Sequence, residues 1–188
     1  MKIGIDFGIT HTDVAISNDH ATNFQTFESL NVNHDLKNVF NFIEDHHDIR
    51  KIFVTGGKSS DLPKTFNGLP VIHKNEIDSI ALGAKKLYDL KDSALIVSTG
   101  TGTACVHFDG NNGNHLGGIA VGGGMLCGLG SLLFNNSGAL EIDEFAEKGD
   151  KSKIDFLIGD VVNKIGNLSP EITAVNFGKA IGSDSATM

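Results

Sequence analysis

The sequence predicts an α/β protein built from two similar halves that face each other across a cleft. A strand, a Gly/Thr turn and a returning strand open the chain around Asp6–Thr10, and the same pattern restarts 92 residues later around Ser98–Gly102. Between the two starts, short apolar runs alternate with segments that have one apolar helical face. The repeated start predicts two domains, residues 1–91 and 92–188, each with its own sheet.

The first half is expected to hold a small sheet and two helices. Two apolar runs flank the first turn and a third follows closely, which predicts an antiparallel meander. Apolar residues at i, i+3, i+4 and i+7 from Leu36 to Ile43 predict a helix, whereas Pro63 and Gly68 predict a loop over 59–68. The remaining expected elements are strands at 2–7, 13–17, 23–28, 51–54 and 70–73 and a helix at 76–89.

The second half is expected to begin with strands and to continue as helices. Gly128 and Gly130 fall inside the first of these helices, where glycine costs about 1 kcal/mol relative to alanine. We therefore expect another segment to pack closely against them. The expected strands are 93–98, 103–108 and 115–120, and the expected helices are 124–134, 139–148, 153–164 and 173–181.

Composition excludes several classes of protein. Of the 188 residues, 40% are hydrophobic and 20% charged, which suits a folded domain rather than a disordered chain. The net charge of −8 argues against nucleic acid and anionic membranes as partners. Neither a signal peptide nor a membrane span is evident. With no Cys/His cluster, Cys105 and Cys127 are expected to be reduced, buried thiols in a cytoplasmic protein.

The first turn combines one carboxylate with small residues. Gly8 and Thr10 follow Asp6 at intervals of two, and glycine lets backbone N–H groups approach a phosphate closely. Asp6 is a candidate Mg²⁺ ligand acting through water, because Mg²⁺ usually retains waters and takes only one or two carboxylates. Turns of this composition are common, so the motif alone also fits an ordinary hairpin.

The second turn repeats the first and is rich in hydroxyl groups. It suits a phosphoryl group or a polar substrate, although a hairpin of small residues is the plainer interpretation. Its residues are Thr99, Gly100, Thr101, Gly102 and Thr103. Three further glycines, Gly122, Gly123 and Gly124, precede a predicted helix and can bring phosphate to its N-terminus. They fit a flexible linker equally well.

Two other phosphate-binding motifs are absent, and one acidic residue is a candidate base. No GxxxxGK[ST] loop and no strand-to-helix GxGxxG segment occurs, which excludes the P-loop and dinucleotide-binding motifs. Glu76 opens the helix at 76–89, where the helix dipole stabilises a carboxylate. That position suits a general base, but it also suits an acid that only stabilises the start of the helix, and Asp78 is a weaker candidate of the same kind.

Taken together, these motifs resemble type II pantothenate kinase, from residue 1 to about 182 and in the right order. The resemblance implies the two-lobe, ribonuclease-H-like fold of actin-like ATPases, with the second lobe lacking its last strands and helices. The segments that carry it are Ile3–Thr10, Thr55–Gly57, Gly100–Thr103, Phe108–Gly110, Gly117–Gly118, Gly122–Met125, Gly128–Gly130, Leu132–Leu133, Lys148–Asp150, Ile154–Asp155 and Asn176–Gly178.

The resemblance also implies an activity and assigns roles. It implies a homodimer that uses ATP and Mg²⁺ to phosphorylate pantothenate, the first step toward coenzyme A. Glu76, in a Glu-x-Asp context, corresponds to the catalytic glutamate. Both turns and Gly122–Gly124 would bind the nucleotide phosphates, and His115, Thr101 and Thr103 would contact the substrate.

Three departures from the family pattern bear on catalysis. Ile9 stands where the family usually has a second glycine, and Asp13 stands where it has a lysine. His115 replaces an arginine. Since phosphoryl transfer relies on positive charge at the phosphates, the alternative is a divergent or non-catalytic member that binds a nucleotide or ligand.

Two other members of the superfamily are disfavoured. The glycine-rich run at 117–130 argues against a kinase for a sugar or N-acetylglucosamine. The lack of cysteines for an iron–sulfur cluster argues against an activator ATPase. If the chain ends naturally at Met188, we expect weak ATP binding and weak or absent kinase activity.

Overall fold

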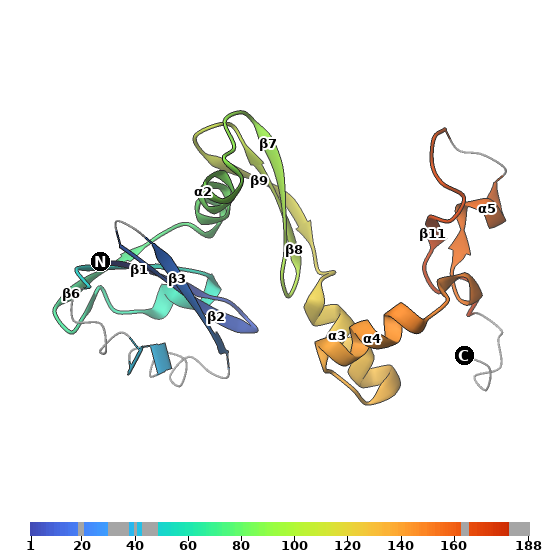
Figure 1. Ribbon diagram of the computed structural model, residues 1–188, viewed down its shortest axis with the longest axis horizontal. Helices are drawn as coiled ribbons and strands as arrows, with labels where there is room; N and C mark the ends of the chain where they lie inside the picture. Colours follow the sequence, from blue (N-terminus) through green and yellow to red (C-terminus); the bar gives the residue numbers. More distant parts are fainter. Residues whose placement is uncertain (19–20, 30–37, 40, 43–48, 163–165, 181–188) are drawn as a thin grey trace. The chain divides into compact units, whose positions relative to one another are not determined.

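The computed structural model describes residues 1–18, 21–29, 38–39, 41–42, 49–162 and 166–180 (Figure 1). The chain divides into two compact units, Met1–Gly128 and Leu129–Met188. The first unit contains a six-stranded and a three-stranded sheet, and the second contains a two-stranded sheet with short helices. Half of the predicted helix at 36–43 lies outside the described residues; residues 38, 39, 41 and 42 are helical.

The six-stranded sheet has the order β3-β2-β1-β4-β6-β5. β1, β2 and β3 form the predicted antiparallel meander, and β4 lies parallel to β1 on its other side. The segment expected to be loop at 59–68 carries part of a 3₁₀ helix and a two-residue strand. The bounds are β1 Lys2–Phe7, β2 His11–Ser17, β3 Thr22–Glu28, β4 Lys51–Thr55, η1 Gly57–Asp61, β5 Thr65–Phe66 and β6 Leu69–His73.

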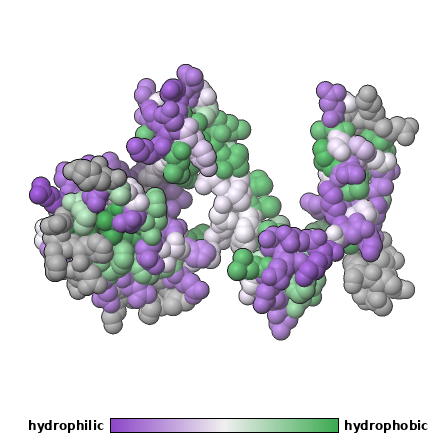
Figure 2. Space-filling view, in the orientation of Figure 1, coloured by the Kyte–Doolittle hydropathy of each residue, from purple (hydrophilic) through white to green (hydrophobic). Residues whose placement is uncertain are grey.

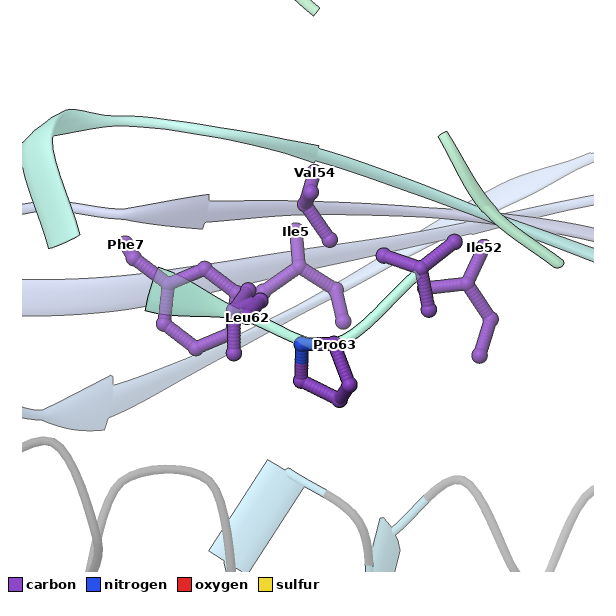
Figure 3. Close-up of a pocket in the computed structure, with 7 residues that line it drawn as sticks. Ile5, Phe7, Ile52, Val54, Leu62 and Pro63 are labelled. Atoms are coloured by element: carbon purple, nitrogen blue, oxygen red, sulfur yellow. The ribbon is translucent and has the colours of Figure 1, made fainter. Parts of the chain in front are cut away.

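One face of this sheet forms the main core of the first unit. Alternate residues of β1, β2 and β4 are buried, because successive side chains of a strand point to opposite faces. Figure 3 shows Leu62 and Pro63, which follow η1, beside Ile5 and Phe7 in a small hollow lined only by apolar side chains. The hollow is part of the core and holds no polar group that could act on a ligand. The buried core residues are Ile3, Ile5, Phe7, Val14, Ile16, Val39, Ile49, Ile52 and Val54.

Helix α2 (Glu76–Tyr88) packs against the second sheet of the first unit. That sheet contains β7 (Ala94–Thr99), β8 (Thr103–Phe108) and β9 (Gly113–Ile119), all antiparallel. Ala81 of α2 is buried with Val106 and Phe108 of β8. A side chain at Gly113 would collide with Ile77 and Ala81, so glycine at this position permits the close approach of β9 to the helix.

Helix α3 (Gly123–Phe134) begins in the first unit and ends in the second. Gly130 is buried, and a Cβ there would lie 2.5 Å from the carbonyl oxygen of Asn136 and from Cδ1 of Ile142 in helix α4 (Ala139–Lys148). The close packing predicted at Gly130 is therefore confirmed. At Gly128 the expectation is wrong, since no atom lies within 4 Å of the position that a Cβ would occupy there.

Two helices that the sequence predicted near the end of the described chain are absent from the described residues. The predicted helix over 153–164 is wrong: residues 151–161 form η2 (Lys151–Lys153), β10 (Phe156–Leu157) and the short α5 (Ile158–Val161). The predicted helix over 173–181 is also wrong, because Thr173–Val175 forms β11, which pairs with β10.

A buried carboxylate explains the structure of this segment. Asp155, 8% exposed, accepts hydrogen bonds from Thr173 Oγ1 at 3.0 Å and from the backbone N–H of Phe177 at 2.9 Å. A helix over 173–181 would direct the Phe177 N–H along its own axis to a carbonyl four residues earlier. The carboxylate instead ties β11 and the turn that follows it to the start of β10.

Candidate active site

Asp6 lies at the end of β1, between two strands that contribute polar side chains. It pairs with Asp13 of β2 and with Thr55 of β4. Paired residues on neighbouring strands point to the same face of a sheet, so Asp6, Asp13 and Thr55 share the face opposite the core. Asp13 Oδ1 in turn accepts a hydrogen bond from Thr26 Oγ1 at 2.6 Å.

The surroundings of Asp6 oppose its negative charge. Partial burial of the carboxyl raises the pKa of Asp6, and the nearby carboxylates of Glu76 and Asp13 raise it further. The residue as a whole is exposed, so it is accessible to a ligand. A cation bound at this carboxylate would relieve the repulsion.

Glu76 lies close enough to Asp6 to affect the pKa of that residue electrostatically. Asn75 caps α2 by accepting a hydrogen bond from the backbone N–H of Asp78, which fixes the first turn of the helix. Asp78 Oδ1 accepts a hydrogen bond from the N–H of Gly113 at 3.4 Å, so it contacts β9. The first turn of α2 thus holds Glu76 exposed near Asp6, while Asp78 is engaged by the second sheet.

The two Gly/Thr turns meet within the first unit. Thr10 Oγ1 lies 2.7 Å from Thr101 Oγ1, a hydrogen bond between residues 91 positions apart. Gly8 allows the first turn to close tightly, since a Cβ at this position would lie 2.6 Å from the carbonyl oxygen of His11. Hydroxyl groups of both turns therefore lie around one point.

The triple glycine packs directly on the second turn. The N–H groups of Gly123 and Gly124 donate to the carbonyl oxygens of Gly100 and Thr101, at 2.8 and 3.0 Å. A Cβ at Gly122 would lie within 3 Å of three backbone atoms of that turn. The glycines therefore have a steric role in this structure, and two of the N–H groups considered for phosphate binding are engaged by the protein.

Three further predicted site residues, Thr99, Thr103 and His115, lie on the second sheet. Thr99 and Thr103 pair with each other across the second turn, and Thr103 Oγ1 donates to the carbonyl oxygen of Val121 at 2.7 Å. His115 is exposed on β9, opposite Val106. Val106 lies three residues along β8 from Thr103, about 10 Å at a strand rise of about 3.3 Å per residue. His115 therefore belongs to the middle of the sheet rather than to the turn itself.

The oxygen groups around Asp6 fit a magnesium ion. The Oγ1 atom of Thr55, beside Asp6, is buried and has no hydrogen-bond partner among the described residues, a condition that a bound water or ion commonly explains. Across the described part of the chain, no three His, Cys, Asp or Glu side chains converge on a metal position. Mg²⁺ needs no such cluster, because one or two carboxylates with waters and phosphate oxygens complete its shell.

Two lysines near Asp6 were not singled out from the sequence. Lys74 lines an open cavity of about 360 Å³ together with Asp6, Asp13 and Thr55. Lys58 follows the Thr55-Gly56-Gly57 turn, and its Nζ lies 3.5 Å from the carbonyl oxygen of Ile9 in the first turn. Lysines that follow β4, the parallel neighbour of β1, and β6, the parallel neighbour of β4, are the sequence signal that identifies both.

The chain is similar to curated proteins over almost its whole length. It is 32% identical over 193 residues to a type II pantothenate kinase from Bacillus cereus (strain G9842), covering 97% of this chain and 68% of that protein. It is 30% identical over 189 residues to a type II pantothenate kinase from Staphylococcus aureus (strain USA300), covering 96% and 67%. The chain belongs to the type II pantothenate kinase family. It spans about two thirds of the length of these relatives.

A family model and a solved structure also match the chain. A model of the family described as Fumble matches residues 91–188. A ROK family glucokinase from Streptomyces griseus, solved with glucose and AMPPNP, matches with a TM-score of 0.59 at 14% identity, covering 79% of this chain and 72% of that one. At this identity the likeness shows the fold, and the predicted α/β fold of the actin-like ATPase type is confirmed. In the part of the chain that the structure describes, none of the helices has both the length and the hydrophobicity of a membrane span.

Proposed function

We propose that this chain is an ATP-dependent kinase that phosphorylates pantothenate in coenzyme A biosynthesis. Family membership supports the reaction. The position of the site is supported by the 2.7 Å contact between Thr10 Oγ1 and Thr101 Oγ1, which brings the two Gly/Thr turns together. Turns of this kind present N–H and hydroxyl groups to phosphate oxygens. Asp6 precedes the first turn on β1, and Glu76 is near enough to Asp6 to raise its pKa, so we assign both to the place where a phosphoryl group and an acceptor hydroxyl would meet.

Each residue then has a chemical role. The turns at Gly8–Thr10 and Thr99–Thr103 bind and orient the phosphates, and Gly122–Gly124 hold the second turn in shape. Glu76 accepts the proton of the pantothenate hydroxyl as it attacks the γ-phosphate. Asp6 and the Thr55 hydroxyl would hold Mg²⁺ through water, and the bound ion would neutralise charge on the phosphates. Thr101, Thr103 and His115 contact the substrate, and His115 donates a hydrogen bond to its carboxylate.

A coupled assay tests this function. ADP release is measured with Mg²⁺ and ATP, with and without pantothenate, and phosphopantothenate is identified by mass spectrometry. We expect release that depends on pantothenate. A matched substrate, N-acetylglucosamine, distinguishes this activity from that of a sugar kinase. ADP release with the sugar and none with pantothenate would contradict the assignment.

A non-catalytic role is the second candidate, and Asp13 favours it. This carboxylate faces Asp6 and raises the pKa of Asp6, so it adds negative charge where phosphates would bind. Such a chain would bind nucleotide or pantothenate without transfer. Calorimetric binding of Mg·ATP or pantothenate, combined with no phosphopantothenate after prolonged incubation, would support this candidate over the kinase.

We also propose that the chain acts in the cytoplasm as a homodimer. The resemblance to type II pantothenate kinase implies the dimer. Leu95 and Val97 on β7 are 64% and 57% exposed, so they offer an apolar surface to a partner. Figure 2 shows hydrophobic side chains over the part of the molecule that contains β7–β9. Sedimentation equilibrium over a hundredfold range of protein concentration tests the dimer.

A further inference from the structure

Phosphate binding near Asp6 requires positive charge, and β2 does not supply it. Asp13 of β2 is acidic and faces Asp6. A bound triphosphate would therefore meet two carboxylates at this sheet position, and like charges at short range disfavour binding. Some other group must supply the cation that phosphoryl transfer depends on.

Lys58 places an ammonium group at the first phosphate turn. Its Nζ lies 3.5 Å from the carbonyl oxygen of Ile9, between Gly8 and Thr10. The residue is half-buried rather than extended into solvent. Its charge therefore stays at the turn, and less side-chain entropy is lost when a ligand binds than for a fully mobile lysine.

The backbone that carries Lys58 is fixed relative to Asp6. Gly56 has φ +87°, and a Cβ at this position would lie 2.5 Å from Asp6 Oδ1 and 2.6 Å from the carbonyl oxygen of Phe7. Only glycine permits so close an approach in this conformation. The N–H of Ser59 donates to the carbonyl oxygen of Gly56 at 3.0 Å, and Ser59 is buried. The turn before η1 thus sets the distance between Lys58 and the end of β1.

The other nearby lysine is placed differently. Lys74 Nζ lies 5.8 Å from the centroid of the Phe53 ring, beside the open cavity on the face of the sheet. Among the described residues, Lys74 makes no hydrogen bond to the first turn, whereas Lys58 reaches a backbone atom of that turn.

We propose that Lys58 is the phosphate-binding cation of this site and compensates for the acid at position 13. The proposal rests on the proposed function, because it assumes that Mg·ATP binds at the first turn. The ammonium group of Lys58 would bind the β- and γ-phosphates as a point charge.

Calorimetry of Mg·AMP-PNP binding tests the proposal without requiring turnover. Lys58→Met keeps the length and removes the charge, and we expect the Kd for Mg·AMP-PNP to rise about tenfold or more. Lys58→Arg should restore binding to within a few-fold of the wild type. Lys64→Met, at an exposed lysine of the segment after η1, removes the same charge from the whole molecule and should change the Kd less than twofold. Thermal unfolding of each variant verifies that it folds.

A second substitution tests the compensation directly. In an Asp13→Lys background, position 13 supplies a cation, so Lys58→Met should raise the Kd by a smaller factor than it does in the wild type. Equal effects of Lys58→Met and Lys64→Met, with the wild type binding Mg·AMP-PNP, would overturn the role of Lys58 and leave the proposed function intact. A wild-type protein that binds neither Mg·AMP-PNP nor inorganic tripolyphosphate would overturn both.

Discussion

At the scale of single residues, Asp6 is stabilised poorly in its charged form. Its pKa is raised, so at a pH between the ordinary value and the raised one the folded state binds more protons than the unfolded state. The free energy of unfolding therefore falls as pH rises through that interval and stays reduced above it. A residue kept at this disadvantage is a candidate for function, because a bound cation would reverse the effect.

Asp6→Asn should stabilise the free protein and impair its function. At pH 7 we expect a higher Tm than in the wild type, and at pH 3, where the carboxyl is protonated in both states, little difference. Mg²⁺-dependent binding of AMP-PNP should be weakened. Differential scanning calorimetry at both pH values, with Asp61→Asn as an exposed control, measures the first effect. An unchanged Mg²⁺ dependence would refute the role of Asp6.

Glu76→Gln should separate chemistry from binding. Removal of a general base commonly costs about 10²–10⁴-fold in rate, so kcat for pantothenate should fall by that factor while the Kd for Mg·ATP stays within a few-fold. Asp89→Asn, at the opposite end of α2 in a left-handed conformation that asparagine tolerates, is the matched control. Normal turnover by Glu76→Gln would show that the residue only stabilises the start of the helix.

At the scale of elements, the glycines of 122–130 differ in how closely other atoms surround them. Gly122 is in close contact with the second turn, whereas a Cβ at Gly128 would have no atom within 4 Å. Gly122→Ala should therefore lower the free energy of unfolding by about 1–3 kcal/mol through overpacking. Gly128→Ala should raise it by up to about 1 kcal/mol, because alanine favours a helix over glycine. Urea unfolding measures both, and equal changes would mean that the two glycines are equivalent.

Periodicity predicted most elements of the first unit because their apolar patterns are set by a buried face. The alternation in β1 and the helical face of α2 are direct consequences of burial. The segments at 153–164 and 173–181 have spacings that also fit a helix, and the deciding interaction is the hydrogen bonding of Asp155 to residues about twenty positions away. No local pattern encodes such a contact.

The sequence predicted which residues are candidates for the site, but it did not predict which charged groups lie beside Asp6 and the first turn. Asp6, Glu76 and the two turns follow from composition and resemblance, and the contact between Thr10 and Thr101 agrees with the repeat. The pairing of Asp6 with Asp13 depends on strand register, and the approach of Lys58 depends on the left-handed turn at Gly56. Both are fixed by tertiary structure.

At the scale of the whole molecule, β7 is an edge strand, since it pairs only with β8 within the described sheet. Its exposed apolar residues and free backbone groups favour association with another chain. Val97→Lys should therefore weaken the proposed dimer and shift the sedimentation equilibrium toward monomer, because lysine on an edge opposes pairing. Asn114→Lys, at an exposed position of β9, adds the same charge elsewhere. An identical monomer–dimer equilibrium in both variants would exclude β7 from the interface.

Asp155 joins β10, β11 and the turn at Phe177 through one carboxylate, and Phe177 itself has φ +58°. A bulky residue in the left-handed region costs about 1–3 kcal/mol and persists only where its surroundings enforce it. The amide hydrogens of these three segments should therefore exchange with solvent at one common rate, as a single opening event, rather than strand by strand. Within the described residues, 154–162 and 166–178 would then form a small cooperative unit that opens and closes independently while the rest of the protein stays folded.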